Sequence, residues 1–472
     1  METRVKVPLI IIGGGLSGLA AGVRSSRFVP EILILEKHSR LGGLNSYYYR
    51  HKNLFETGLH AITNYAEPRD KKAPLNRLLR QLKIKRELLE ICPQKRSEIR
   101  FHGTNSLFFS NDFEMLQEEI LQKFPQSYPL FEKMLKRLAE VDPYRPAPFT
   151  SAKKFLDESL QNPLLSQMLL CPLMYYGSSV ENDMDLGQFA IMFQAIFQEG
   201  MFRPKGTIKD LLTLIEEKFR VNGGTIRKNA EVVRIIFAGK EARGVELVSG
   251  EIIECDHLLS TIGHHETMAL TASPRKLPRQ DARKGRLGFI ETIFQIPTEN
   301  SSQLPKDRTI IFYNNAEKFR YQQVETTADF ASGVICFPQN FVGIEAGKHI
   351  EVRSTHLASY DLWLQLYSEG GKREKYLAAK KLVARNSART LEDLIGKFSQ
   401  NTVYQDTFTP ITIERYTSKI GGAIYGSPDK IKDGDLGFDN LFLAGTDQGF
   451  LGIVGSMLSG VSIVNQHILP KL

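Results

Sequence analysis

Cysteine and tryptophan are scarce in this chain. Its 472 residues include 4 cysteines and 1 tryptophan, with 42% hydrophobic and 24% charged residues, which is the composition of a folded globular protein. No two cysteines form a CxxC pair. The spacing therefore argues against both a disulfide-dense secreted scaffold and a cysteine-based zinc site. We expect a large, reduced protein and predict no metal site.

A strong excess of charge of one sign is also missing. The chain has 61 Lys and Arg against 53 Asp and Glu, a net charge of +8. No nucleic-acid-binding motif accompanies this charge, so we predict no nucleic-acid partner. Basic residues gather in two stretches, 69–86, where leucines separate them, and 275–286. Such stretches are typical of a solvated helix face, which we favour slightly, or of a segment that lies on an anionic membrane.

The N-terminal sequence shows no secretory leader, since Glu2 and Pro8 precede a predicted strand that runs directly into a glycine turn. A charge-free stretch over 448–470 is long enough to cross a bilayer, which takes about 20 apolar residues. Its glycines and serines, with Asn465 and His467, predict instead a buried helix whose small residues allow close approach to a ligand. We expect a cytoplasmic protein without a signal peptide or transmembrane segment.

A dinucleotide-binding pattern opens the chain. Residues 5–12 predict a buried strand, residues 13–18 read Gly-Gly-Gly-Leu-Ser-Gly before an apolar helix, and residues 31–36 predict a second strand that ends on Glu36. Gly13 makes the tight turn and Gly15 lets the backbone reach a pyrophosphate. Gly18 lets the helix and the strand pack closely. This context predicts an adenine dinucleotide, with its phosphates at the helix start and a ribose on Glu36.

The residues after Glu36 point to a family. Arg40 and the pair Gly42-Gly43 complete a Glu-x-x-x-Arg-x-Gly-Gly run, in which the double glycine admits the cofactor and the arginine pairs with phosphate. This run resembles the FAD-dependent amine oxidase and phytoene desaturase superfamily. Leu44 stands where many members carry arginine, and Gly58-Leu59-His60 is similar to a Gly-x-His motif of carotenoid desaturase, carotene isomerase and retinol saturase-like members. Both features favour that branch.

Later motifs extend the resemblance over nearly the whole chain, through residues 409–426, 440–447 and 452–460. The resemblance implies that the backbone of Val232 contacts adenine and that Asp447 binds the ribityl or phosphate region. The helix start after residue 452 would stabilise negative charge on the reduced flavin. The implied cofactor is FAD, and the residues implied to bind it are Gly13, Gly15, Leu16, Ser17, Gly18, Glu36, Lys37, Arg40, Gly42, Gly43, Leu44, Val232, Asp447, Ile453 and Val454.

The expected fold class is α/β. A Rossmann-type FAD-binding domain would be assembled from three segments, and an inserted α+β substrate domain, with a mixed sheet and a helical cap, from the two segments between them. These segments are 1–84, 201–265 and 416–472 for the FAD-binding domain and 85–200 and 266–415 for the substrate domain. No second G-x-G-x-x-G lies on a predicted strand, so we expect no separate NAD(P)H domain.

The resemblance implies an FAD-dependent oxidoreductase that acts on CH–CH groups of a long apolar polyene or isoprenoid, carotenoid- or retinoid-like. The reaction would be desaturation, saturation or flavin-assisted cis–trans isomerisation, with a quinone, oxygen or an external reductant as the redox partner. A flavin amine oxidase acting on a small amine ranks second, because no lysine is an obvious candidate near the flavin. A non-catalytic flavin- and lipid-binding protein is the third possibility.

Few acids or bases are expected around a hydrocarbon substrate. His60 is the candidate catalytic residue, whereas for Glu56 we favour a structural role. The resemblance implies that Tyr416 and Tyr425 border the substrate. The large apolar residues of 85–200 predict mostly plain core and in part a tunnel for a long apolar chain. Because polyenes dissolve in membranes, we expect the cap and the basic stretches to contact a membrane peripherally.

Overall fold

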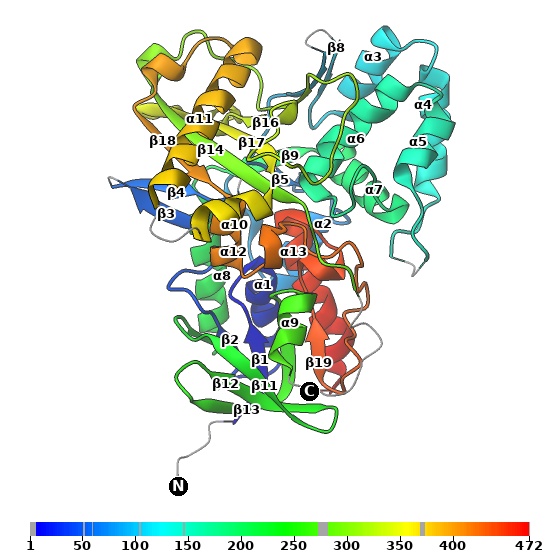
Figure 1. Cartoon of the computed structure of the whole chain (residues 1–472). Coiled ribbons are helices and arrows are strands. Elements are labelled where there is room, and N and C mark those ends of the chain that lie inside the picture. Colours follow the sequence, from blue (N-terminus) through cyan, green and yellow to red (C-terminus); the bar gives the residue numbers. More distant parts are fainter. Residues whose placement is uncertain are drawn as a thin grey trace.

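The computed structural model describes residues 6–50, 52–58, 60–102, 105–144, 147–271, 282–368 and 373–471. Two seven-stranded sheets carry most of the fold, one in the lower and one in the upper half of Figure 1. Two sequence predictions fall partly outside the described residues. These are the second basic stretch, at Arg275, Lys276 and Arg279, and the Gly-x-His motif, at Leu59.

The first sheet has the strand order β10-β2-β1-β13-β12-β11, and β19 also pairs with β13. Its strands are β1 (Lys6–Ile12), β2 (Leu33–Leu35), β10 (Thr225–Arg227), β11 (Val232–Ala238), β12 (Glu241–Leu247), β13 (Ile252–Ser260) and β19 (Leu441–Leu443). The pairs β10–β2, β2–β1, β1–β13 and β13–β19 are parallel, as in a Rossmann-type sheet, whereas β11–β12 and β12–β13 are antiparallel.

Helices cover one face of the first sheet. They are α1 (Leu16–Ser25), α2 (Pro74–Leu82), α8 (Ile208–Val221) and α13 (Gly452–Ile463). Side chains alternate along a strand, so Leu9 and Ile11 of β1 pack into the core with these helices, while Ile10 and Ile12 pack with residues of the antiparallel strands. α13 lies so close to α1 that a Cβ on Gly460 would stand 2.1 Å from the carbonyl oxygen of Ser17.

α13 continues through η8 (Val464–Ile468) and η9 (Leu469–Lys471). Within the described part of the chain, Gly452–Lys471 is the one helix long and apolar enough to cross a membrane. The core helix of a globular protein meets the same criterion, and 56% of the apolar window is buried inside this fold.

The second sheet has the order β18-β14-β17-β16-β15-β7-β8. Its strands are β7 (Ser97–Phe101), β8 (Asn105–Phe109), β14 (Gly288–Pro297), β15 (Ile310–Asn314), β16 (Ser332–Cys336), β17 (His349–Ala358) and β18 (Tyr404–Phe408). The sheet is mixed, because β15 and β7 pair in parallel while the other neighbours are antiparallel. This mixed sheet beside the Rossmann-type sheet confirms the predicted α/β fold class.

Helices flank the second sheet on two sides (Figure 1). The helical group at the β7–β8 end is α3 (Phe113–Lys123), α4 (Tyr128–Ala139), α5 (Ala152–Leu160), α6 (Pro163–Gly177) and α7 (Leu186–Phe193), followed by the π-helical η2 (Gln194–Gln198). The helices near β14 and β18 are α10 (Tyr360–Ser368), α11 (Arg373–Ile395) and α12 (Pro410–Thr417). α9 (His264–Leu270) follows β13 of the first sheet.

Two small sheets lie between the large ones. The hairpin β3 (Tyr47–Arg50) and β4 (Asn53–Glu56) is one. The other has the order β5-β9-β6, from β5 (Ile62–Thr63), β9 (Met201–Pro204) and β6 (Ile91–Pro93). Because β9 pairs here, the chain returns to the first sheet only after residue 204.

Candidate active site

A cleft of about 1500 Å³ runs between the two large sheets. Pockets for one drug-sized ligand measure roughly 300–1,000 Å³, so this cleft has room for a cofactor and a second molecule. Its floor comes from the loops that follow β1 and β2, its roof from β14, β16 and β17, and one wall from α12 and the turn after it.

The glycine motif forms an open cradle at the start of α1. Gly13 has φ +102°, and a Cβ on Gly18 would lie 2.0 Å from the carbonyl oxygen of Gly13, so neither position accepts a side chain. Gly15, in contrast, has no atom within 4 Å of the place where its Cβ would be. The hydroxyl of Ser17 is buried without a hydrogen-bond partner among the described residues. This open space at a helix N-terminus fits the pyrophosphate of FAD.

Glu36 lies in the cleft at the end of β2, held by two backbone donors. Its Oε2 accepts the N–H of Gly14 at 2.8 Å, and its Oε1 accepts the N–H of His38 at 2.8 Å. Each carboxylate oxygen has a second lone pair, so the side chain is fixed and still able to accept hydrogen bonds from a ribose. Lys37 and Arg40 also line the cleft.

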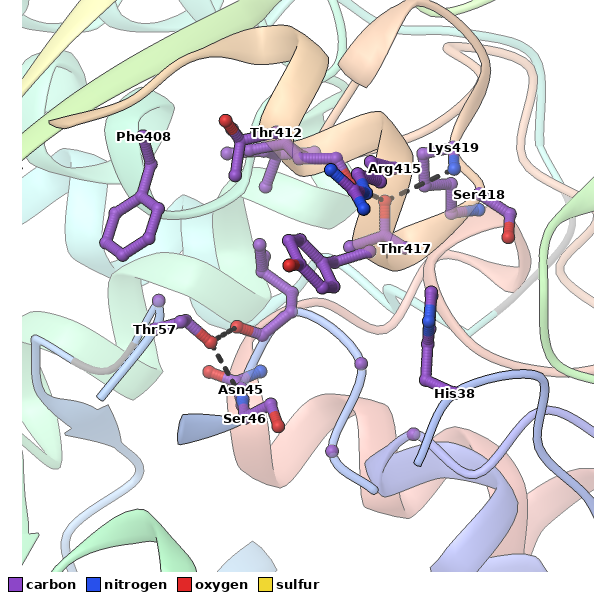
Figure 2. A pocket seen from close by; sticks show the side chains of 18 of the residues that line it. His38, Asn45, Ser46, Thr57, Phe408, Thr412, Arg415, Thr417, Ser418 and Lys419 are labelled. Atoms are coloured by element: carbon purple, nitrogen blue, oxygen red, sulfur yellow. Dashed lines mark hydrogen bonds between the residues drawn. The ribbon is translucent and has the colours of Figure 1, made fainter. Parts of the chain in front are cut away.

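The double glycine packs onto the glycine cradle. Gly42 donates its N–H to the carbonyl of Gly14 at 2.9 Å and forms a β-bridge with Gly15. The loop then continues through Leu44, whose carbonyl accepts the hydroxyl of Thr57 at 2.7 Å. The next residues, Asn45 and Ser46, lie beside Thr57 at the cleft (Figure 2), and Ser46 donates its N–H to the hydroxyl oxygen of Thr57 at 3.0 Å. The two predicted cofactor segments therefore form one continuous surface.

The remaining predicted cofactor residues divide into two groups. Val232 and Ile453 line the cleft, together with Gly452 at the start of α13. Gly18 and Val454 lie beneath it: Val454 is fully buried among apolar residues between α13 and α2. These two residues support the cleft wall.

Asp447 lies next to the cleft, in the turn that follows β19. Its carboxylate points into the protein, where it accepts the N–H groups of His264 at 2.7 Å and Ser427 at 2.8 Å and lies 3.5 Å from the ammonium of Lys419. Although burial opposes ionisation, the nearby Lys419 and Lys430 and the two N–H groups hold the pKa of Asp447 at about 2. The carboxylate of Asp447 therefore does not line the cleft, whereas Gly445 and Thr446 of the same turn do. Contact of Asp447 with the ribityl or phosphate region stays a prediction.

The roof of the cleft is a row of side chains across four strands. Register pairs Phe408 with Glu291, Glu291 with Thr355, and Thr355 with Val334. Directly opposed residues of antiparallel strands point to the same face, and all four line the cleft. We call the part of the cleft under this row the inner chamber; its other walls are apolar or aromatic, from Tyr175, Tyr176, Phe289, Ile424 and Tyr425.

His60 faces this chamber and contacts the polar members of the row. Its Nε2 lies 3.3 Å from Oε1 of Glu291 and 3.4 Å from Oγ1 of Thr355. Glu291 in turn lies 2.9 Å from Nε of the fully buried Arg353. Burial opposes ionisation of Glu291, yet Arg353 and His60 hold its pKa at about 2. The chamber therefore holds an imidazole beside a permanent carboxylate.

Glu56 lies behind the chamber and does not line it. Its carboxylate forms a buried ion pair with Arg203 and accepts the N–H of Ile208 at 2.6 Å. Arg203 also donates to the carbonyl of His60 at 3.0 Å. This geometry suits the structural role that we favoured for Glu56.

The two predicted substrate tyrosines lie apart. Tyr425 is in the inner chamber, where its hydroxyl donates to the carbonyl of Tyr175 and its ring packs against Phe289, with the centroids 6.0 Å apart. Tyr416 is part of α12, and the centroid of its ring lies 5.5 Å from that of His38, which follows Glu36 by two positions. Tyr416 thus lines the nucleotide end of the cleft.

Sequence reasoning missed Glu291, Arg353 and Thr355. The sequence offers only a weak signal: Glu291 is the one charged residue of strand Gly288–Pro297, whereas Arg353 and Thr355 lie in strand His349–Ala358 among several other polar residues. Most of the large apolar residues predicted for core or tunnel are core: of those in α6, Met168, Leu169, Leu170 and Met174 are buried, while Tyr175 and Tyr176 reach the chamber.

The leucines of the first basic stretch are buried in the protein core. Those of α2 pack into the core of the first sheet and are at most 4% exposed, namely Leu75, Leu78, Leu79 and Leu82. Its basic residues are thus left without exposed leucines beside them, as on a solvated helix face. A different surface combines exposed apolar and basic residues among those that line the cleft. We call it the rim; it consists of the exposed residues Tyr49, Arg50, Tyr367, Arg373 and Leu377 and the half-buried Lys380, which pairs with Asp406.

Known proteins share both the sequence and the fold. The profile of the family described as flavin containing amine oxidoreductase matches residues 16–354. A 4,4'-diaponeurosporene oxygenase of Staphylococcus aureus is 22% identical over 98% of this chain and 97% of its own. A 4,4'-diapophytoene desaturase (4,4'-diapolycopene-forming) of Methylomonas sp. is 23% identical over 57% of this chain and 56% of its own. An engineered putrescine oxidase superposes with a TM-score of 0.65 at 13% identity, over 99% of this chain and 100% of its own.

Proposed function

Because the chain belongs to the flavin containing amine oxidoreductase family and is an FAD-dependent oxidoreductase, we propose that it desaturates a long apolar polyene or isoprenoid, carotenoid- or retinoid-like. The observation that carries this proposal is the inner chamber. It is walled by Tyr175, Tyr176, Phe289 and Val334, and its polar groups are gathered at His60, Glu291 and Thr355. The names of the two sequence relatives, an oxygenase and a desaturase of carotenoid-type compounds, support the same substrate class.

Desaturation removes two hydrogens from neighbouring carbons. FAD, when bound, supplies the acceptor for the hydride. The protein has to accept the proton, and His60 is the residue we assign to that step, because its imidazole faces the chamber beside the carboxylate of Glu291. The aromatic walls exclude water and hold the apolar chain by burial, which gains roughly 25 cal/mol for each Å² of apolar surface.

A small amine fits the chamber less well. An ammonium group would need a free carboxylate, and Glu291 is the carboxylate of the roof. Its Oε1 is already paired with Arg353 at 2.9 Å and with His60 at 3.3 Å. The putrescine oxidase likeness rests on the fold alone, at 13% identity. We therefore treat amine oxidation as an outcome that the experiment would reveal.

The test is an anaerobic titration of the yellow holoenzyme, with the visible absorption of the flavin as the readout. Acyclic polyenes in detergent go to one sample and a panel of amines to another. Bleaching by polyenes alone is expected. Bleaching by amines would overturn the proposal, and so would an unbleached flavin in both samples. In the second case the dithionite-reduced enzyme with the same polyenes would identify saturation, isomerisation or binding without turnover from the products.

We also propose that the protein is cytoplasmic and binds a membrane peripherally through the rim. Tyr49, Tyr367 and Leu377 are 43%, 57% and 42% exposed and belong to the rim with arginines and a lysine. Tyrosines beside basic residues suit the interface of an anionic bilayer, which is where an apolar substrate would be delivered.

Flotation with vesicles of phosphatidylcholine, with or without phosphatidylserine, tests this contact. Binding should need the anionic lipid, fall with salt, and be lost in the Arg50→Glu/Arg373→Glu variant. The matched control is Lys71→Glu/Lys72→Glu on the first basic stretch, which should float like the wild type. The opposite pattern, or no flotation of the wild type at low salt, would reject the rim as the contact.

A further inference from the structure

Two residues of the chamber roof, Glu291 and Thr355, lie close to one ring nitrogen of His60. Nε2 of His60 faces Oε1 of Glu291 at 3.3 Å. No hydrogen bond joins Nδ1 to any described residue, and the side chain lines the cleft at 14% exposure. The two ring nitrogens therefore have different surroundings, one against the strand wall and one toward the chamber.

The carboxylate of Glu291 is itself held in place. Arg353 is completely buried, contacts Glu291 through Nε at 2.9 Å, and donates through its other end to the backbone carbonyl of Glu56. Register fixes Glu291 directly opposite Thr355, whose hydroxyl lies 3.4 Å from the same Nε2. Glu291 stays ionised, with its pKa at about 2, so its Oε1 is a negative charge 3.3 Å from Nε2 and attracts a proton on that nitrogen. The hydroxyl of Thr355 can accept a hydrogen bond from a protonated Nε2.

The backbone of His60 is fixed as well. Its carbonyl accepts Nη1 of Arg203 at 3.0 Å and lies 3.6 Å from the thiol of Cys336. With both backbone and ring held, the imidazole has one orientation in the chamber. The partner of one ring nitrogen sets the tautomer of the whole ring.

We propose that Glu291, itself fixed by Arg353, is the positioning residue that keeps the proton of neutral His60 on Nε2, so that Nδ1 is the atom that takes the proton of the substrate. The inference rests on the proposed function and deepens it. In the desaturation step one hydrogen leaves as hydride to the oxidised flavin and the other as a proton to Nδ1. The electron pair of the second C–H bond forms the new C=C bond. Glu291 then stabilises the imidazolium that results.

The first test measures the tautomer and needs no substrate. Holoenzyme labelled with ¹⁵N-histidine is examined by NMR, and the His60→Gln variant identifies the His60 signals. The wild type should show protonated Nε2 and unprotonated Nδ1 at high pH. A wild type protonated on Nδ1 would overturn the inference even if polyenes are turned over.

The second test uses single-turnover bleaching of the flavin by a polyene. Glu291→Gln should lose the single tautomer, keep its FAD and its KM for polyene, and bleach ~10²-fold more slowly, the low end of what acid–base catalysis contributes. The matched control is Glu351→Gln. Glu351 belongs to the neighbouring strand β17 and its carboxylate also lies near Arg353, but it does not touch His60. The control variant should leave tautomer and rate unchanged.

The outcomes separate the two claims. An unchanged rate and tautomer in Glu291→Gln would reject the inference and leave the proposed function standing. A wild type with the expected tautomer that no polyene bleaches would reject the proposed function and leave the positioning role standing. If Glu291→Gln does not fold with FAD, the tautomer of the wild type still tests the inference. The milder Thr355→Val variant then gives a second measurement, in which the Nε2–H tautomer is expected to remain and its loss would reject the role of Glu291.

Discussion

The carboxylate of Asp447, behind the wall of the cofactor cleft, lies 3.5 Å from the ammonium of Lys419, a buried residue that lines the cleft. A second ammonium, that of Lys430, donates to the carbonyls of Tyr425 at 2.6 Å and Thr446 at 3.1 Å. Tyr425 lines the inner chamber and Thr446 the cofactor end. The buried charges thus join the two ends of the cleft, which gives Asp447 a structural role.

Replacing Asp447 with asparagine should therefore destabilise the fold. Removing one partner of a buried ion pair costs about 3–5 kcal/mol, because the other charge is left uncompensated. We expect the midpoint of thermal unfolding to fall by several degrees. The control is Asp429→Asn, which breaks an exposed pair with Arg283 worth ~0–1 kcal/mol. Equal midpoints for the two variants would contradict the structural role.

The same pair predicts a pH dependence. The pKa of Asp447 is about 2 in the folded protein against an ordinary 3.8, so the folded state binds the proton less readily than the unfolded chain. Its stabilisation is complete above the ordinary pKa and is lost as the pH falls through about 2. The difference in unfolding midpoint between wild type and Asp447→Asn should shrink over that range, measured by differential scanning fluorimetry.

We expect Gly18→Ala and Gly15→Ala, two similar substitutions in the glycine motif, to have different effects. Gly18→Ala places a methyl group 2.0 Å from the carbonyl of Gly13, so both the fold and FAD binding should suffer, with overpacking costing roughly 1–3 kcal/mol or more. Gly15→Ala meets no protein atom within 4 Å and should fold normally by circular dichroism. Its methyl group points into the space we assign to the pyrophosphate, so it should be purified with little flavin. Full flavin content in Gly15→Ala would move the pyrophosphate elsewhere.

The residues at the cofactor end of the site could be predicted from the sequence because they are close together in the chain. The glycine motif, Glu36 and the double glycine lie within residues 13–43, and spacing alone implies how they fold together. The direction of the Asp447 side chain could not be predicted in this way. The motif indicates the turn after β19, but the carboxylate is turned inward by the N–H groups of His264 and Ser427 and by Lys419, which the spacing does not place.

The chamber could not be predicted in the same way. More than 200 residues separate His60 from Glu291 in the sequence. Glu291 and Thr355 come together through the register of β14 and β17, and both contact His60. Long-range strand register is set by the complete sheet, and a shift of one residue would have turned Glu291 away from the cleft. Tyr416 and Tyr425 share a motif nine positions apart, yet the turn between them sends them to opposite ends of the site.

The thiols should be unreactive in the folded protein. All four cysteines are free and buried, and burial raises the pKa of Cys255 and Cys336 to about 12. The thiolate is the reactive form, so a disulfide reagent at pH 8 should label almost no thiol in the native protein. All four should react in denaturant. Rapid labelling of native protein would contradict the burial of at least one of these thiols.

The length of the inner chamber gives the last prediction. Val334 ends the roof row opposite Thr355 and is 3% exposed, with its side chain on the cleft side. Val334→Phe enlarges a side chain that lines the cleft and should leave the FAD content near that of the wild type. If the apolar chain occupies this part of the cleft, the variant should bleach with long polyenes at least ~10-fold more slowly, since reacting atoms displaced by about 1 Å can cost 10²-fold. Shorter polyenes that end before Val334 should react at the wild-type rate.

Val334→Ala is the control, because it widens the cleft at the same position and should favour the long chains. Equal slowing of long and short polyenes by Val334→Phe would mean that the substrate enters the cleft without reaching the inner chamber.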